Sequence, residues 1–332
     1  MKKKFLLVLT LLIFSLSLTG CTTWLKNDKG AIVKESTTGQ NLAENILCQP
    51  DNEDVIKTYK ENNVKIKKLP KCSEFTPASG KYDGVWSSLF IKPLSWLIIQ
   101  IGKFLSNYGL AIIVVTIIIR LIILPISKKS AMQSENMKLA QNDLAKLEKK
   151  YRNKQSQEQQ MMKAQEMLGI YKKYDISPMS GCIFAFIQMP LFFAFLESLN
   201  RLPVVFEGNL FGFNLGTSPF NALFGGSFNF NHFVDSFSTG NIIYILLPII
   251  VGLTTYFSFK LNSGLNTSMP EQEKQMKMMM NFMLIFIVFA SFTMSTSIII
   301  YWITGSLFTI IQSIILRRKK NESSKKRSKN KQ

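Results

Sequence analysis

The chain has 332 residues, of which 47% are hydrophobic and 26 are phenylalanine, a composition that is rich for a soluble protein. Its formal charge of +19 fits binding to nucleic acid or to anionic lipid, or the lysine bias of cytoplasmic loops. The apolar residues are clustered, because residues 108–126 carry one charge and residues 181–196 carry none. Such runs are typical of bilayer-spanning helices and exclude an ordinary soluble domain.

Residues 1–20 form a predicted lipoprotein signal peptide. Three lysines precede an apolar stretch that ends in Leu18-Thr19-Gly20-Cys21, which is similar to a lipobox. We expect Cys21 to be lipidated and to become the mature N-terminus outside the cytoplasm. An uncleaved first span or an ordinary signal peptide is the alternative.

Residues 21–84 are polar and predict a small, loosely ordered extracytoplasmic segment. Cys48 and Cys72 both lie there, where a disulfide is chemically permitted, and the sequence leaves paired and free thiols equally open. Cys182 is expected to be a small packing residue. The sequence has no CxxC pair or His/Cys cluster, so we expect no metal site.

The rest of the chain predicts an all-α membrane protein with a five-span core. Residues 85–103 have the aromatic-edged pattern of an interfacial amphipathic helix, although Pro93 argues against one straight helix. The core covers residues 104–316, with spans at about 105–126, 181–199, 241–260, 280–296 and 297–316.

The last two predicted spans share an uncharged run of 34 residues from Met283 to Leu316. This run is too long for one span, so we expect a tight helical hairpin around residues 295–297. One long bent helix is the alternative.

Lysine and arginine predict the orientation in the membrane. Residues 127–179 carry eleven such residues, whereas residues 200–240 carry only Arg201, and the tail 317–332 carries nine. We therefore expect the 127–179 segment, the loop 261–279 and the tail in the cytoplasm. The N-terminus and the 200–240 loop are expected outside, in agreement with the lipobox.

The 127–179 segment predicts a cytoplasmic helical hairpin. Apolar residues recur every three or four positions in two stretches that flank a polar turn near residues 153–156. Each stripe is expected to cover the other. The first stripe is Met137, Ala140, Leu144, Leu147 and Tyr151, and the second is Met161, Ala164, Leu168 and Tyr171.

No constellation of residues indicates catalysis. The only histidine, His232, lies in a predicted loop among Asn and Phe, and is expected to be a surface residue. Phosphate-binding patterns such as GxxxxGK[ST] and GxGxxG do not occur. We therefore expect a protein that is not an enzyme and that uses no cofactor.

Arg120 lies inside an otherwise apolar predicted span. An arginine there costs about 2.5–3.5 kcal/mol on insertion scales, so it needs compensation by water or polar groups. Snorkelling to the cytoplasmic headgroups is the alternative interpretation. Thr116 stands one helical turn away, and no acidic span residue obviously neutralises the guanidinium. We interpret Arg120 as a hydrated receiving site for acidic or polar groups of a passing polypeptide.

Several ordered motifs then resemble the YidC/Oxa/Alb membrane protein insertases. They cover residues 100–316 and comprise Tyr108-Gly109-Leu110 through Arg120 to Pro125, Tyr171-Lys172-Lys173-Tyr174, Gln188-Met189-Pro190, and Tyr301-Trp302 with Gly305 through Gln312. The lipobox and the short N-terminal segment are similar to the Gram-positive form of the family.

The resemblance implies a membrane protein insertase and folding chaperone with a groove around Arg120. It implies that Thr116, Gln188, Tyr301 and Trp302 line this groove, although Gln188, Tyr301 and Trp302 also suit plain helix packing. The implied partners are nascent membrane proteins and the Sec translocon. The basic tail 317–332 adds ribosomal RNA or anionic lipids as expected partners. A small-solute channel or secondary transporter with an anion site at Arg120 is the alternative function.

Overall fold

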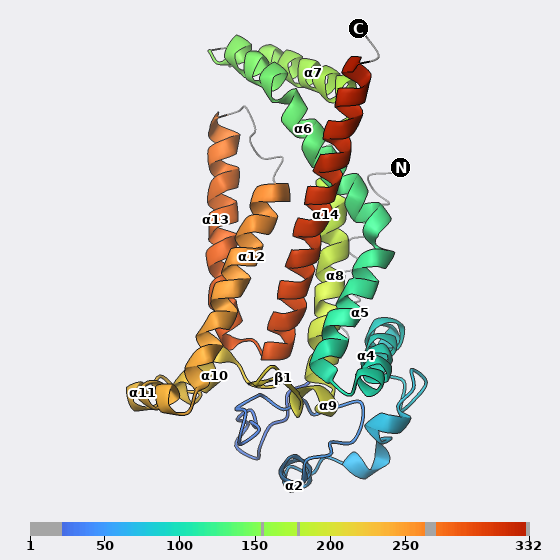
Figure 1. The fold of residues 1–332 in the computed structure, drawn as a ribbon, viewed down its shortest axis with the longest axis vertical. Helices are drawn as coiled ribbons and strands as arrows, with labels where there is room; N and C mark the ends of the chain where they lie inside the picture. The colour runs from blue at the N-terminus through green and yellow to red at the C-terminus, as the bar shows by residue number, and fades with distance from the viewer. Residues whose placement is uncertain (1–21, 154–155, 178–179, 263–269, 330–332) are drawn as a thin grey trace. The chain divides into compact units, whose positions relative to one another are not determined.

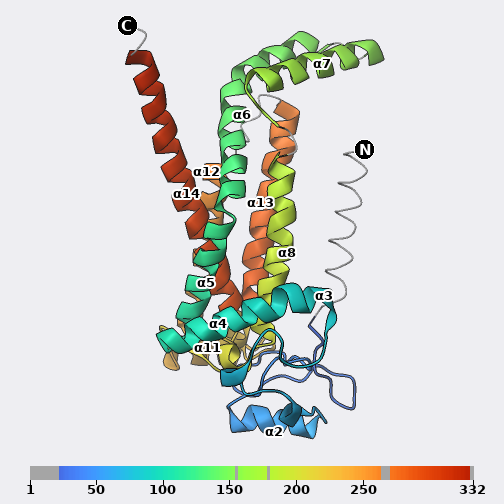
Figure 2. The same ribbon diagram turned by 90° about the vertical axis from the view of Figure 1, so that its right-hand side faces the viewer.

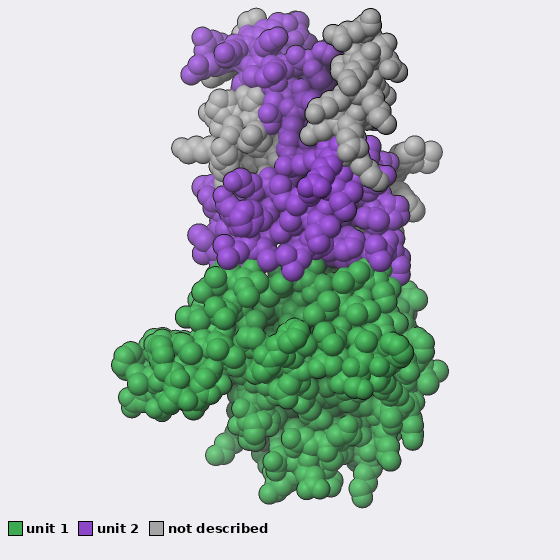
Figure 3. Space-filling model, in the orientation of Figure 1, with its two compact units in different colours: residues 1–119, 186–251, 288–304 green, residues 120–185, 252–287, 305–332 purple. Residues whose placement is uncertain are grey.

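The computed structural model describes residues 22–153, 156–177, 180–262 and 270–329. The signal peptide and the expected lipidation site Cys21 lie outside these residues. Helices dominate the described chain (Figure 1). The described residues also contain one β hairpin, whose antiparallel strands β1 (Asn209–Leu210) and β2 (Phe213–Asn214) have two residues each. The chain divides into two compact units, shown in green and purple in Figure 3.

The N-terminal part of unit 1 is ordered, so the expectation of a loosely ordered segment is wrong. Isolated bridges join Trp24 to Ala43 and Lys34 to Asn41. The helix α2 (Glu53–Glu61) and the short turns η1 (Ile66–Lys68) and η2 (Cys72–Glu74) follow. The apolar residues of this segment are too irregularly spaced for the sequence to predict its ordered fold. The buried cluster that holds the segment together comprises Leu25, Leu42, Ala43, Ile46, Val55, Tyr59, Ile66 and Phe206.

Cys48 and Cys72 form a disulfide in this segment, with an S–S distance of 2.01 Å and a sequence separation of 24 residues. Both sulfur-bearing residues are buried in the main core cluster of unit 1, together with Phe75 and Trp86. The bridge therefore closes a loop within the N-terminal segment, and its burial packs that segment against the helices that follow it.

A continuous helical run occupies residues 84–105, where the sequence predicts an interfacial helix. It consists of α3 (Gly84–Trp86), the π-helical turn η3 (Ser87–Ile91) and α4 (Lys92–Leu105). Pro93 does not break the run, because it stands in the first turn of α4, where a missing N–H is tolerated. Figures 1 and 2 together show α4 running across the ends of the upright helices of unit 1.

Two of these upright helices are α5 (Tyr108–Ile122) and α8 (Ser180–Asn200). The helix α5 begins at Tyr108 because Asn107 caps it, its side-chain oxygen accepting a hydrogen bond from the Leu110 amide at 2.9 Å. Ile98, Ile112 and Phe195 lie fully buried at the centre of the unit 1 core.

The 200–240 segment folds into short elements of unit 1. After α9 (Pro203–Phe206) and the β hairpin come α10 (Pro219–Phe224), α11 (Phe230–Ser238) and the turn η4 (Asn241–Ile245). Asn221 joins this segment to the N-terminal segment, because its side-chain nitrogen donates to the Gly39 carbonyl at 2.9 Å.

Three helices continue the chain, namely α12 (Leu246–Asn262), α13 (Pro270–Thr293) and α14 (Thr296–Lys329). The break between α13 and α14 falls where the sequence predicts a turn around residues 295–297, and it excludes one continuous helix. Thr296 stabilises the break, because its amide and hydroxyl both donate to the Thr217 carbonyl, at 2.9 and 2.8 Å.

Unit 2 contains the predicted helical hairpin, formed by α6 (Leu124–Tyr151) and α7 (Gln157–Lys173). Both ribbon views show the two helices side by side (Figures 1 and 2). The stripe expected on α6 is confirmed, because Ala140, Leu144, Leu147 and Tyr151 are buried.

The stripe expected on α7 is wrong at three of its four positions. Met161, Ala164 and Leu168 are exposed, whereas Tyr171 packs against the buried cluster as expected, together with Met167 and Ile170. Apolar residues occupy both faces of α7, so periodicity alone does not choose between them. Ion pairs with α6 orient the helix, since Lys163 Nζ lies 2.7 Å from Glu148 and Glu166 Oε1 lies 2.6 Å from Lys150.

Three helices are long and apolar enough to cross a membrane: residues 84–105, 241–261 and 296–318. A fourth is added if α5 and α6, a bent pair broken at Ile123, are counted as one span. The count covers the described residues only, and it includes neither α8 nor α13, in which Met278–Thr293 is a shorter apolar stretch. The protein is thus a helical, membrane-type chain with three or four candidate spans, and the predicted five-span count stays a prediction.

Candidate functional site

The charged centre of the candidate site is Arg120, which is only 9% exposed in unit 2. It lies in the last turn of α5, two residues before the helix ends at Ile122. The chain restarts at once as α6, with Pro125 in its first turn. A proline tolerates the first turn of a helix but not its interior, so the sequence itself dictates a helix boundary just beyond the arginine.

Gly305 of α14 lies next to the Arg120 guanidinium. A Cβ atom at position 305 would lie 2.6 Å from Arg120 Nη2 and 3.3 Å from Arg120 Cζ. Both distances are shorter than ordinary van der Waals contact, so a side chain at position 305 would make the flexible end of Arg120 shift, and glycine leaves room for it. The Gly305 carbonyl accepts a hydrogen bond from Thr309 Oγ1 at 2.8 Å.

Other polar side chains of the unit 2 helices are buried as well. Ser127 and Gln312 hydrogen-bond each other, with Gln312 Nε2 3.1 Å from Ser127 Oγ. Thr254, Thr255 and Ser313 are also buried. Buried polar groups in an apolar span are costly unless they are hydrogen-bonded, so the hydrogen bond between Ser127 and Gln312 stabilises the contact of α6 with α14.

Arg317 anchors the end of the apolar part of α14 in the same unit. Its Nε lies 3.2 Å from Glu135 Oε1 of α6, and its Nη2 donates to the Leu261 carbonyl of α12. Glu135 also pairs with Lys138 at 2.6 Å. Arg317 thus joins three helices of unit 2.

The predicted groove residues Gln188, Tyr301 and Trp302 lie in unit 1. Gln188 Nε2 lies 3.4 Å from the Tyr301 hydroxyl, and Tyr301 stacks on Phe195 with ring centroids 4.2 Å apart. Phe192 contacts the rings of both Tyr301 and Trp302, at 6.3 and 5.3 Å.

The structure therefore brings Gln188, Tyr301 and Trp302 together. With Phe192 and Phe195 they form a cluster that joins α8 to α14. Tyr301 is only 2% exposed, so it packs in the core of unit 1, as the alternative interpretation of this residue expected. Its hydroxyl accepts the hydrogen bond from the Gln188 side-chain amide.

Thr116, on the α5 helix of unit 1, is fully buried and donates its hydroxyl proton to the Ile112 carbonyl at 2.6 Å. Gly109 of the same helix has a packing role, because a Cβ atom there would lie 2.6 Å from Leu210 Cβ. The small residues of α5 are thus explained by close contacts inside unit 1.

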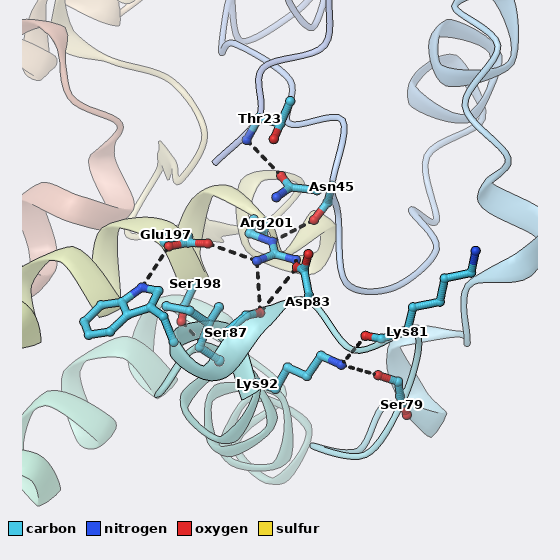
Figure 4. Close-up of polar contacts among 12 residues, drawn as sticks. Thr23, Asn45, Ser79, Lys81, Asp83, Ser87, Lys92, Glu197, Ser198 and Arg201 are labelled. Atoms are coloured by element: carbon cyan, nitrogen blue, oxygen red, sulfur yellow. Dashed lines mark hydrogen bonds and ion pairs between the residues drawn. The ribbon is translucent and has the colours of Figure 1, made fainter. Parts of the chain in front are cut away.

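A buried ion cluster around Arg201 was missed by sequence reasoning. Arg201 Nη1 lies 3.0 Å from Glu197 Oε1, Nη2 lies 2.5 Å from Asp83 Oδ2, and Nε donates to the Asn45 carbonyl at 2.7 Å (Figure 4). Trp86 Nε1 donates to the other Glu197 oxygen at 3.1 Å. The available signal was the spacing of Glu197 and Arg201, four residues apart on one helical face.

The Arg201 cluster connects three distant segments of unit 1. Asn45 belongs to the N-terminal segment, Asp83 and Trp86 stand at the start of the 84–105 helical run, and Glu197 lies in the last turn of α8. Its charges satisfy one another, so we assign the cluster to structure. The described residues contain no group of three or more His, Cys, Asp or Glu side chains that could hold a metal ion.

Comparison with known proteins identifies the family. The family model described as 60Kd inner membrane protein matches residues 100–325. The membrane protein insertase YidC of Oceanobacillus iheyensis is 31% identical over 255 residues, which covers 75% of this chain and 91% of the relative.

Two further relatives agree. Membrane protein insertase YidC 2 of Bacillus anthracis is 31% identical, over 76% of this chain and 90% of the relative. Membrane protein insertase MisCA of Bacillus subtilis is 31% identical, over 75% of this chain and 86% of the relative. The matched range includes α5 with Arg120, α8, and α14 with Gly305, and the chain therefore belongs to the YidC/Oxa/Alb family of membrane proteins.

Proposed function

We propose that this protein is a membrane protein insertase and folding chaperone, which moves segments of nascent membrane proteins into the bilayer alone or with the Sec translocon. The observation that carries the proposal is the buried guanidinium of Arg120, held against Gly305 among buried polar side chains in unit 2. The names of the relatives, which are membrane protein insertases, support the same function.

In the proposed mechanism, Arg120 receives acidic or polar groups of the substrate. A positive charge in a partly hydrated, low-dielectric site attracts such groups and lowers the free energy needed to remove them from bulk water. The apolar part of the substrate then passes into lipid, driven by the hydrophobic effect. The membrane potential assists acidic segments that move outward. Thr116, Gln188, Tyr301 and Trp302 are predicted to line the path.

The test is insertion of a small substrate whose translocated tail is acidic, in vesicles containing purified protein. Arg120→Ala is expected to reduce insertion severalfold, and Arg120→Lys to retain more activity, because it keeps the positive charge. Arg318→Ala is the matched control, since it removes an exposed arginine from the same unit. Normal insertion by Arg120→Ala at equal protein abundance would contradict the electrostatic role.

The proposed topology has five spans, with Cys21 lipidated outside and the C-terminus in the cytoplasm. The contrast between eleven basic residues in 127–179 and one in 200–240 supports it. Labelling of cells with a palmitate analogue is expected to mark the wild-type chain and to miss Cys21→Ser. Label retained by Cys21→Ser would contradict lipidation at Cys21.

The basic tail is proposed to contact the ribosome or anionic lipids in the cytoplasm. Because Arg317 joins three helices of unit 2, a truncation should begin after Arg318 and leave that contact intact. Salt-sensitive co-sedimentation with ribosomes is expected for the full chain and not for the truncated one. Loss of binding to vesicles of anionic lipid, with unchanged ribosome sedimentation, would favour lipid as the partner.

A further inference from the structure

The helix α11 presents an apolar face that nothing in its own unit covers. Phe230, Val234 and Phe237 recur at intervals of four and three residues, which places them on one side of the helix, and Phe228 precedes them. The exposed fraction is 80% for Phe228, 69% for Phe230, 52% for Val234 and 61% for Phe237. Figure 3 shows this part of unit 1 as a protrusion.

The rest of the α11 surface divides into a packed side and a polar side. Ser236 is buried, His232 Nδ1 lies 3.3 Å from the Leu223 carbonyl, and Phe233 stacks on Phe224 of α10 with centroids 5.4 Å apart. The polar side consists of the exposed residues Asn231, Asp235 and Ser238. The helix is therefore held in place by one side, with an apolar sector and a polar sector left facing outward.

Continuity with a membrane span indicates what covers the apolar sector. Gly240 (φ 76°) links α11 directly to the candidate span of residues 241–261. Ile243, Leu246 and Ile249 of that span are exposed, as expected of side chains that face lipid. The apolar sector of α11 thus lies within a few residues of the point where the chain enters the bilayer.

The division of side chains between the two sectors supports the same occupant. Residues 202–259 contain no lysine or arginine, and α11 carries one acidic side chain, Asp235, on its polar sector. A helix with aromatic residues on one side, polar residues on the other and a position beside a span has the properties of a segment that rests in the headgroup region.

We propose that the Phe228, Phe230, Val234 and Phe237 surface of α11 is a lipid-binding surface that lies in the outer-leaflet interface under the proposed topology. The phenyl rings enter the boundary between headgroups and acyl chains, and Asn231, Asp235 and Ser238 stay in water. The surface anchors the segment before α12 to the bilayer. This role concerns the seating of the protein in the membrane and does not depend on insertase activity.

Fluorescence of a label placed around α11 tests the proposal in the full chain reconstituted into phosphatidylcholine vesicles. Single cysteines at 230, 234 and 237 probe the apolar sector, and cysteines at 231, 235 and 238 provide matched controls on the polar sector. Cys182→Ser forms the background, the Cys48–Cys72 disulfide is left intact, and the same protein without a new cysteine gives the blank. Each position carries an environment-sensitive label, and nitroxide-bearing phosphatidylcholine serves as the quencher.

Labels at 230, 234 and 237 are expected to emit at shorter wavelength and to be quenched severalfold more by nitroxide lipid than labels at 231, 235 and 238. Equal, weak quenching at all six positions would overturn the proposal. Short-wavelength emission at the apolar positions without lipid quenching would also overturn it, because that result indicates a second copy of the chain as the occupant. Dilution of the protein in lipid then restores long-wavelength emission.

Discussion

At the scale of single residues, Gly305 leaves room for the Arg120 side chain beside α14. A glycine in the interior of a helix costs roughly 0.5–1 kcal/mol relative to alanine, so its presence in α14 needs a reason in the packing around it. The close approach of the Arg120 side chain is that reason. The position can therefore be tested without changing the charge.

Replacement of Gly305 by valine is expected to displace the guanidinium and to reduce insertion of substrates with acidic tails. Its effect should not add to that of Arg120→Ala, because both changes act through one group. The insertion rates of the two single variants and the double variant measure the coupling. Gly169→Ala is the control, since no atom lies within 4 Å of the added Cβ. Full additivity would show that Gly305 acts independently of Arg120.

Arg201 is the second residue whose surroundings determine a prediction. Its side chain is 3% exposed and satisfies the buried carboxylate of Glu197. Removal of one partner of a buried ion pair leaves the other charge unsatisfied and typically costs about 3–5 kcal/mol, whereas loss of both partners costs less.

Arg201→Met is therefore expected to lower the thermal stability of the purified protein strongly, and Arg201→Met with Glu197→Gln to recover part of the loss. Asp83→Asn should have a smaller effect, because the Asp83 side chain is 44% exposed and its ion pair is screened by solvent. Unfolding in detergent, followed by circular dichroism, measures all three. Equal destabilisation by Asp83→Asn and Arg201→Met would contradict the ranking.

Three ion pairs join α6 to α7 and contribute to the orientation of α7. Asp143 Oδ2 lies 2.6 Å from Lys173 Nζ and accepts a hydrogen bond from the Tyr174 hydroxyl at 3.0 Å. These two hydrogen bonds hold the pKa of Asp143 below its usual range. The contribution of the pair is thus present at neutral pH and is lost as the pH falls through that depressed pKa.

Loss of this pair by Lys173→Ala is expected to increase amide hydrogen exchange in α6 and α7 at most severalfold, because solvent screens an exposed ion pair. The same change should appear in wild-type protein at high salt. Lys172→Ala removes a neighbouring exposed lysine and serves as the control. No difference between the two variants would assign the orientation of α7 to Met167 and Ile170 alone.

At the scale of the whole molecule, the N-terminal segment is an ordered part of unit 1. All of it precedes the range matched by the family model, which begins at residue 100. It nevertheless contributes the Cys48–Cys72 disulfide to the main core cluster and its Asn45 carbonyl to Arg201. The segment therefore stabilises the ends of the helices it contacts.

Removal of the disulfide by Cys48→Ser with Cys72→Ser is expected to destabilise this segment by roughly 3 kcal/mol in the chain-entropy model, given the separation of 24 residues. Limited proteolysis of the reconstituted protein should then cut within residues 22–83 faster than in wild type. Cys182→Ser is the control for the loss of a cysteine elsewhere. Unchanged protease resistance would show that packing alone orders the segment.

The sequence by itself determined the features that depend on neighbouring residues. Uncharged runs predicted the apolar helices, and the spacing on α6 predicted its buried stripe. The serine and threonine residues at 295–297 predicted the break between α13 and α14. These features follow from hydropathy and backbone preference, which act over a few residues.

Tertiary structure alone decided the features that join distant parts of the chain. It buried Tyr301 against Phe195, placed Gly305 beside Arg120, turned α7 by its ion pairs, and gathered Asp83 around Arg201. Periodicity identifies an apolar face but does not name the partner of that face, because the partner is separated by tens to hundreds of residues. The arginine was visible in the sequence, and the glycine that positions it became meaningful only in the folded chain.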